Sequence, residues 1–266
     1  MLTLANIFTK SCQTQQIKDN FPFCFCCDML VGTSPLNHSW REKRVGMTIL
    51  QLPKSIQGIV VDLDRTLYPR SEGDPYLADS AERSMPFLGE RLGMSIEDAE
   101  LLAEVKRQEW IAQEGRRPVF AELLDSLGID PLSWYPIRAR CCHPEKFISP
   151  NPNLRKVLIR TRAMVRVAIL TNAPQVVAHR VLHCIGVADL GFPVCSPDAF
   201  RSFKPQQQAF HAAATALELE GEHLVAIGDR LATDCEAALA AGYGGAVHVK
   251  GPEDVIAFIR TVLFTR

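Results

Sequence analysis

Two aspartates follow a short run of β-branched residues, and this pattern constrains the fold more than any other. Ile59, Val60 and Val61 predict a strand buried on both faces. Asp62 and Asp64 come at its end, and because strand side chains alternate, we expect both carboxylates on one side of the backbone. Carboxylates this close repel each other unless a cation or a shared proton intervenes. The pattern indicates a Mg²⁺ site or a nucleophile–acid pair, and the alternative is an acidic turn in solvent.

Two later apolar runs, at residues 165–170 and 224–227, also predict buried strands that end in polar side chains. The residues concerned are Thr171 and Asn172 after the first run, Asp229 and Asp234 after the second, and Lys204 between them. Ligands bind at the carboxyl ends of the strands in open parallel sheets, so we expect these side chains to converge with Asp62. Taken alone, each has an ordinary alternative, namely a strand-end turn, a loop lysine before a helix-starting proline, or a helix N-cap.

In combination, these segments resemble the four motifs of the haloacid dehalogenase-like (HAD) hydrolases in their order along the chain. The motifs are Asp62-Leu-Asp64-Arg-Thr66, Thr171-Asn172, Lys204-Pro205, and Gly228-Asp229 with Asp234. The similarity covers about residues 56–250, and four motifs in this order are very specific. The Leu-Tyr-Pro that follows Thr66 is similar to pyrimidine 5'-nucleotidase-like members, although a tripeptide discriminates weakly. Arg65 stands where many relatives have Asn, Gly or Met, at a variable position.

The resemblance implies phosphoryl transfer through a phospho-aspartate. Asp62 would be the nucleophile, and Asp64 would protonate the leaving oxygen and then activate water. Thr66, at the turn, would hydrogen-bond the backbone and orient Asp64. Thr171 and the amide of Asn172 would hold the non-bridging phosphate oxygens.

The resemblance also implies Mg²⁺ as the cofactor. Asp62, the backbone carbonyl of Asp64, and Asp229 would be its ligands. Lys204 would neutralise charge on the nucleophile and on the phosphoryl group. Asp234 would either support the metal shell or pair with Lys204.

Strands that alternate with helices predict an α/β fold, a Rossmann-like parallel sheet with helices on both faces. The stretch between the first two strands is far longer than a single crossover connection needs. Within it, the apolar residues of 71–149 recur at helical spacing. The resemblance identifies them as a C1-type helical cap inserted after the first strand, and residues 47–70 and 150–266 as the core domain. The alternative is that these helices only extend the core.

Within this helical segment, the spacing of apolar residues predicts one helix from Tyr76 to Leu92. Ser95 is predicted to cap the next helix, and Asp98, three residues further on, completes a variant of the capping box.

Residues 1–46 differ from the rest of the chain because they lack clear periodicity and contain Cys24, Cys26 and Cys27. They also lack the apolar region and small-residue cleavage site of a secretory signal. Met47 leads directly into the first strand, so we hypothesise that it is the natural start and that residues 1–46 are a disordered or non-native extension. Nine cysteines, an odd number, argue against a disulfide framework and favour reduced thiols in a cytoplasmic enzyme.

Charge and hydropathy narrow the possible functions. Thirty acidic and 29 basic residues give a net charge of −1, so we expect no structural nucleic-acid partner. The longest apolar runs are strand-sized, so we expect no membrane partner. The oligomeric state is not predicted.

The leading hypothesis is a Mg²⁺-dependent hydrolase of a small phosphorylated metabolite, a nucleotide or sugar phosphate. A phosphomutase of the same superfamily and a catalytically inert phospho-ligand-binding protein are the alternatives. A dehalogenase is disfavoured because that chemistry has no use for a second acid at Asp64.

Overall fold

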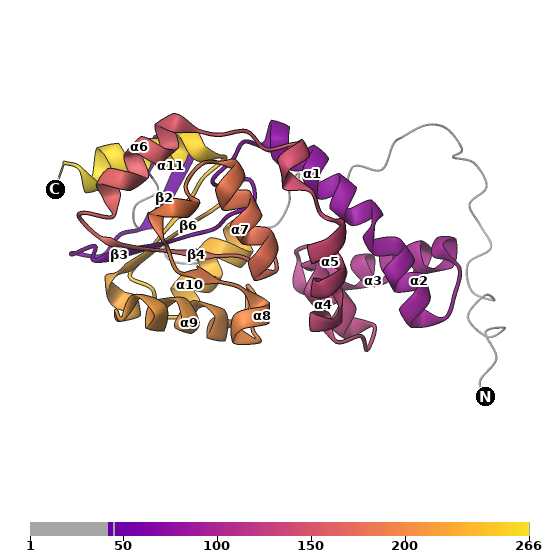
Figure 1. The fold of residues 1–266 in the computed structure, drawn as a ribbon. Helices are drawn as coiled ribbons and strands as arrows, with labels where there is room; N and C mark the ends of the chain where they lie inside the picture. Colours follow the sequence, from indigo (N-terminus) through magenta and orange to yellow (C-terminus); the bar gives the residue numbers. More distant parts are fainter. Residues whose placement is uncertain (1–41, 45, 266) are drawn as a thin grey trace.

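The computed structural model describes residues 42–44 and 46–265 (Figure 1), which contain one seven-stranded sheet of order β1-β2-β7-β6-β3-β4-β5. The strands are β1 (Glu42–Arg44), β2 (Met47–Gln51), β3 (Gly58–Val61), β4 (Arg166–Leu170), β5 (Val194–Cys195), β6 (Leu224–Gly228) and β7 (Gly245–His248). Strands β3 to β7 pair in parallel, and β1 and β2 add an antiparallel edge. The predicted parallel sheet is confirmed.

Helices cover both faces of the sheet, as predicted (Figure 1). On one face lie α6 (Pro152–Thr161), α7 (Gln175–Cys184) and α11 (Pro252–Phe258); on the other lie α8 (Pro197–Phe200), α9 (Gln207–Leu217) and α10 (Ala237–Ala240). Consecutive residues of β3 face opposite layers, since Ile59 and Val61 pack in the first apolar cluster and Val60 in the second. Short 3₁₀ segments occur at residues 131–134, 144–146, 188–190 and 221–223, and π-helical segments at 231–236 and 259–263.

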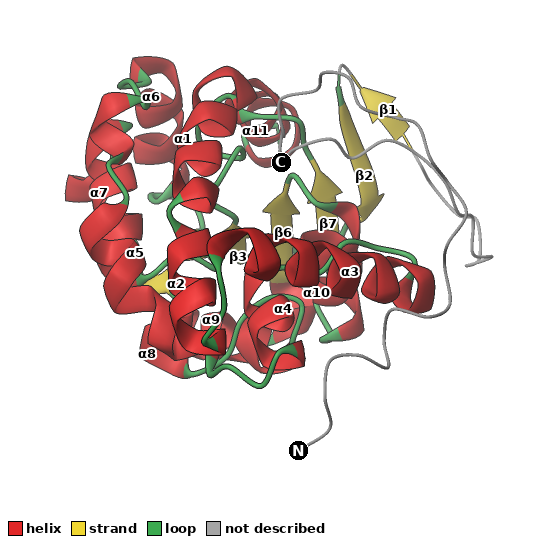
Figure 2. Ribbon diagram, turned by 90° about the vertical axis from the view of Figure 1, so that its right-hand side faces the viewer, coloured by secondary structure: helices red, strands yellow, loops and turns green. Residues whose placement is uncertain are grey.

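Five further helices lie beyond one end of the sheet, at the right of Figure 1, and we call them the helical insert. They are α1 (Arg70–Glu82), α2 (Ser84–Leu92), α3 (Ile96–Glu114), α4 (Phe120–Ser126) and α5 (Tyr135–Cys141). The insert has its own apolar cluster, which includes Phe87, Leu124 and Trp134. Figure 2, seen from the side of the insert, shows α2, α3 and α4 in front of the strands. The assignment of residues 71–149 as a cap stays a prediction.

The single helix predicted over Tyr76–Leu92 is wrong, because the structure divides it at Arg83 into α1 and α2. Pro86 is the third residue of α2, in the first turn, where its missing N–H needs no partner within the helix. One uninterrupted helix would instead place the Pro86 ring against the carbonyl of Glu82, which favours a break before α2.

The edge strands β1 and β2 form an antiparallel hairpin, with Glu42 opposite Ile49 and Arg44 opposite Met47. The predicted boundary at residue 47 therefore falls inside a hairpin. The other predictions for the N-terminal extension concern residues that the structure does not describe, Cys24, Cys26 and Cys27 among them.

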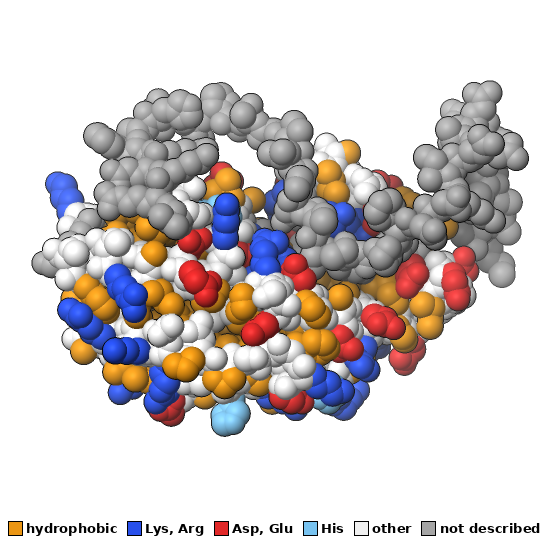
Figure 3. Space-filling view, turned by 90° about the horizontal axis from the view of Figure 1, so that it is seen from above, with side chains coloured by type: hydrophobic (Ala, Val, Ile, Leu, Met, Phe, Trp, Pro, Cys, Tyr) orange, Lys and Arg blue, Asp and Glu red, His pale blue; other side chains and the backbone are white. Residues whose placement is uncertain are grey.

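The molecular surface mixes charge types. The face seen in Figure 3 carries both acidic and basic side chains, with apolar ones scattered among them. Among the helices that the structure describes, none has the length and apolar character needed to cross a membrane.

The predicted N-cap of α3 is confirmed. Ser95 Oγ accepts a hydrogen bond from the backbone N–H of Asp98 at 3.1 Å and donates one to Asp98 Oδ2 at 2.9 Å. The cap satisfies a backbone donor that the first turn of a helix otherwise leaves without a partner.

Replacing this cap tests how much it stabilises the protein. We expect Ser95→Ala to cost about 1 kcal/mol, which lowers the Tm by about 2–4 °C for a chain of this size. Ser95→Asn is the matched control, since Asn caps as well as Ser, and it should keep the wild-type Tm. An unchanged Tm in Ser95→Ala, measured by circular dichroism, would contradict this role.

Candidate active site

Three parallel strands bring the predicted polar residues to one edge of the sheet. Central strand β3 pairs with β4 on one side and β6 on the other, with Val61 level with both Ile169 and Ile227. Immediately beyond this level, the backbone N–H of Asp62 donates to the carbonyl of Ile227 at 2.8 Å. Residues that follow each of the three strands therefore meet at this edge, as expected for parallel strands.

Lys204 forms the centre of this group. Its Nζ donates to Asp62 Oδ1 at 2.5 Å and to Asp234 Oδ1 at 2.7 Å, and all three side chains are less than one-tenth exposed. Burial acts to lower the pKa of Lys204, but the two carboxylates outweigh it and raise that pKa above its ordinary value. The lysine therefore remains charged.

The loop after β4 fixes the backbone of Lys204. Asn172 Oδ1 accepts from the Lys204 N–H at 2.8 Å, and Asn172 Nδ2 donates to the Lys204 carbonyl at 2.9 Å. The Lys204–Pro205 peptide bond is cis. Nearby, Thr171 Oγ1 accepts from the backbone N–H of Ala173 at 3.0 Å, and Thr171 is fully buried.

Thr66 has a different partner from the one predicted. We expected its hydroxyl to bond the backbone and orient Asp64, but Thr66 Oγ1 donates to Asp62 Oδ2 at 2.8 Å. The physical reason is the turn at Leu63, whose carbonyl accepts from the N–H groups of Thr66 and Leu67 and so folds the chain back over Asp62.

The two aspartates of the first motif lie in different surroundings. Tyr68 Oη donates to Asp64 Oδ1 at 2.7 Å, and Arg138 Nη2 of α5 lies 3.7 Å from Asp64 Oδ2. Asp64 thus faces the helical insert, whereas Asp62 faces Lys204. Sequence analysis missed Tyr68 and Arg138 as neighbours of the site. A tyrosine four residues after an aspartate was a readable local signal, but nothing in the sequence links Arg138 to Asp64.

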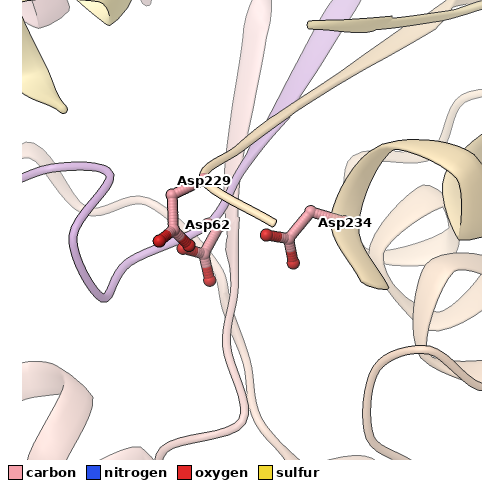
Figure 4. A group of neighbouring side chains, drawn as sticks. All are labelled: Asp62, Asp229 and Asp234. Carbon is pink, nitrogen blue, oxygen red and sulfur yellow. The ribbon is translucent and has the colours of Figure 1, made fainter. Parts of the chain in front are cut away.

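Asp62, Asp229 and Asp234 form a buried group in which one carboxylate oxygen from each residue lies within 4.8 Å of the others (Figure 4). Burial raises the pKa of Asp62 to about 7, although Lys204 opposes the shift. Burial, with Asp234 nearby, raises the pKa of Asp229 to about 6. An all-oxygen donor set of crowded carboxylates fits Mg²⁺, which would relieve their repulsion.

The contacts of Asp234 favour its second predicted role, pairing with Lys204. Its Oδ1 accepts from Lys204, and its Oδ2 accepts from the backbone N–H of Arg230 at 2.9 Å. A Cβ on Gly228 would lie 2.4 Å from the Cβ of Asp234, so glycine is required for this close approach. Asp229 instead forms an ion pair with Arg70, whose Nη2 lies 3.2 Å from Asp229 Oδ2. The side chain of Asp64 lies outside the carboxylate group that the structure identifies.

Comparison with known proteins gives one family match. A model of the haloacid dehalogenase-like hydrolases matches residues 56–242. Among curated proteins, the chain is 28% identical over 193 residues to a glyceraldehyde 3-phosphate phosphatase of Methanopyrus kandleri, covering 70% of this chain and 81% of that one.

Similar solved structures include a HAD phosphatase from Thermococcus onnurineus (TM-score 0.43, 22% identity, 72% of this chain and 85% of that one). Another is L-2-haloacid dehalogenase from Xanthobacter autotrophicus with chloropropionic acid covalently bound (TM-score 0.43, 23% identity, 71% and 75% covered).

The raised pKa of Asp62 predicts how stability changes with pH. Between about pH 4 and 7 the folded metal-free protein keeps a proton that the unfolded chain has lost, so stability falls as the pH rises through that window. We expect Asp62→Asn, in EDTA, to raise the Tm at pH 8 by about 2–8 °C, or about 1–2 kcal/mol. The gain should shrink as the pH falls to 5.

The control for this experiment is Asp189→Asn, because Asp189 is exposed and its pKa is lowered by the hydrogen bond from Arg155. That variant should not raise the Tm at either pH. A Tm of Asp62→Asn equal to or below wild type at pH 8 would contradict the burial of an unfavourable charge.

Proposed function

The chain belongs to the haloacid dehalogenase-like hydrolases, and from this premise we propose that it hydrolyses the phosphomonoester of a small phosphorylated metabolite, such as a nucleotide or sugar phosphate, with Mg²⁺ as cofactor. The observation that carries the proposal is the buried bridge of Lys204 between Asp62 and Asp234. It holds a carboxylate in a fixed orientation beside a permanent positive charge, as attack on an anionic phosphate requires. The similarity to a curated phosphatase supports the same reaction class.

Asp62 is the proposed nucleophile. Hydrogen bonds from Lys204 and Thr66 orient both of its oxygens. As an Asp62 oxygen bonds to phosphorus, the bond from phosphorus to the leaving oxygen breaks and that oxygen takes a proton from Asp64. In the second step Asp64 takes a proton from water, the water oxygen attacks phosphorus, and inorganic phosphate leaves Asp62.

Thr171 and Asn172 are proposed to hold the phosphate. Because Thr171 Oγ1 already accepts from Ala173, its proton is available for donation to a phosphate oxygen. The Asn172 side chain is engaged with Lys204, so its backbone N–H is the amide that would reach the phosphate. Bound Mg²⁺, held by Asp62 and Asp229, would neutralise charge on the phosphoryl oxygens.

The helical insert is proposed to be the cap of this enzyme. Support comes from α5, where Arg138 donates to the Asn172 carbonyl at 3.3 Å and lies near Asp64, so the insert reaches both loops of the site. A cap in this place would exclude water and select the leaving group.

The five described cysteines are free thiols, which agrees with the proposed cytoplasmic location.

Phosphate release from a panel of nucleotide, sugar and small organic phosphates tests the proposal, with Mg²⁺ and with EDTA. We expect metal-dependent release that Asp62→Asn lowers at least about 10³-fold, because the variant lacks the nucleophile. Asp189→Asn should keep wild-type activity, because Asp189 is exposed and pairs with Arg155 and not with any residue of the site.

Two outcomes would overturn this proposal. Release that survives Asp62→Asn would show that the nucleophile is another residue. Turnover that needs a bisphosphate activator, without net phosphate release, would indicate a phosphomutase.

A further inference from the structure

Arg138 of α5 is a largely enclosed cation whose donors are only partly used. Its side chain is 12% exposed, and its Nε has no hydrogen-bond partner among the described residues. One N–H group donates to the Asn172 carbonyl at 3.3 Å, and Asp64 Oδ2 lies 3.7 Å from Nη2, beyond hydrogen-bond distance. A guanidinium has five N–H donors, and leaving them without partners in the protein interior is costly.

Two tyrosine hydroxyls lie beside this arginine. Tyr76 Oη of α1 and Tyr135 Oη of α5 are buried, and neither has a hydrogen-bond partner of normal geometry among the residues described. Burial raises the pKa of both phenols, and the nearby charge of Arg138 opposes that rise in each. The Nε of Arg138 and the hydroxyls of Tyr76 and Tyr135 are therefore buried polar atoms without a hydrogen-bond partner among the described residues, and the two tyrosines lie near enough to Arg138 to feel its charge.

This cluster lies beside the two loops to which we assign phosphate binding and proton transfer. Arg138 reaches Asp64, the proposed acid for the leaving oxygen, and the carbonyl of Asn172, on the proposed phosphate-binding loop. A phosphomonoester held between those two loops directs its organic part toward the insert, and so toward Arg138.

We propose that Arg138, with the hydroxyls of Tyr76 and Tyr135, binds a carboxylate on the leaving group, so that the preferred substrates are phosphorylated hydroxy acids. This inference rests on the proposed phosphatase function. The planar guanidinium fork matches a carboxylate in a two-point contact, and the tyrosines donate to its remaining lone pairs. Asp64 already lies 3.7 Å from Arg138, so a singly charged carboxylate would add less negative charge beside Asp64 than a second phosphate would.

Two matched substrate pairs test the proposal: 3-phosphoglycerate with glycerol 3-phosphate, and 2-phosphoglycolate with 2-hydroxyethyl phosphate. In each pair the carboxylate is replaced by a neutral hydroxymethyl group. We expect wild-type kcat/KM to favour the carboxylate in at least one pair by about 10-fold or more, the size of a hydrogen-bonded charge contact. Arg138→Gln should bring that ratio close to one, mainly through KM of the carboxylate substrate. Arg138→Lys keeps the charge but loses the planar two-point contact, so it should retain part of the preference for the carboxylate substrate.

Arg180→Gln is the matched control variant. Arg180 of α7 also joins the core to α5, since its Nη1 donates to the carbonyls of Ala139 at 2.8 Å and Cys142 at 3.2 Å. An arginine that only docks the insert should affect both members of a pair equally, so Arg180→Gln should leave the ratio unchanged.

The inference is overturned if wild type shows no preference in either pair, if the preference survives Arg138→Gln, or if Arg180→Gln removes it as well. If the enzyme cleaves other phosphomonoesters but none of these four substrates, the inference is also overturned, although the phosphatase function stands. If Mg²⁺-dependent phosphate release is seen with no phosphomonoester, both the inference and the proposed phosphatase function are overturned.

Discussion

A buried ammonium group shared by two carboxylates determines how the rest of the site is arranged. Lys204 Nζ lies 2.5 Å from Asp62 and 2.7 Å from Asp234, which follow different strands of the sheet. Burying three charged groups has a large desolvation cost, which is offset only by good geometry and further hydrogen bonds. Those bonds are present: Thr66 donates to Asp62, and the Arg230 N–H donates to Asp234. The carboxylates are therefore held in place before any substrate binds.

The sheet separates the two acids of the first motif into two environments. Asp62 lies among Lys204 and the acidic residues after β6, where burial raises its pKa to about 7. Asp64 turns toward the insert and accepts a hydrogen bond from Tyr68. Different surroundings suit the two side chains to the different roles that we propose for them, Asp62 as nucleophile and Asp64 as proton carrier. The insert contributes Arg138 to the second environment, 3.7 Å from Asp64.

The sheet and the convergence of the polar residues were predictable because both follow from local patterns. Buried β-branched runs set the strands, and parallel strands bring their carboxyl ends to one edge. Contacts between distant segments were not predictable: no local rule places Arg138 near Asp64 or pairs Asn172 with the backbone of Lys204. The partner of Thr66 depends on how tightly the chain turns at Leu63, which sequence spacing does not specify.

We propose that Asp62 carries the phosphoryl group during turnover. Borohydride reduces an acyl phosphate to an alcohol, so quenching the enzyme during turnover with borohydride would convert a phosphorylated aspartate to homoserine. Peptide mass spectrometry would then locate the modified residue. We expect homoserine at position 62 only, and only when both Mg²⁺ and substrate are present. Homoserine at Asp64, Asp229 or Asp234, or its absence from an enzyme that is releasing phosphate, would contradict it.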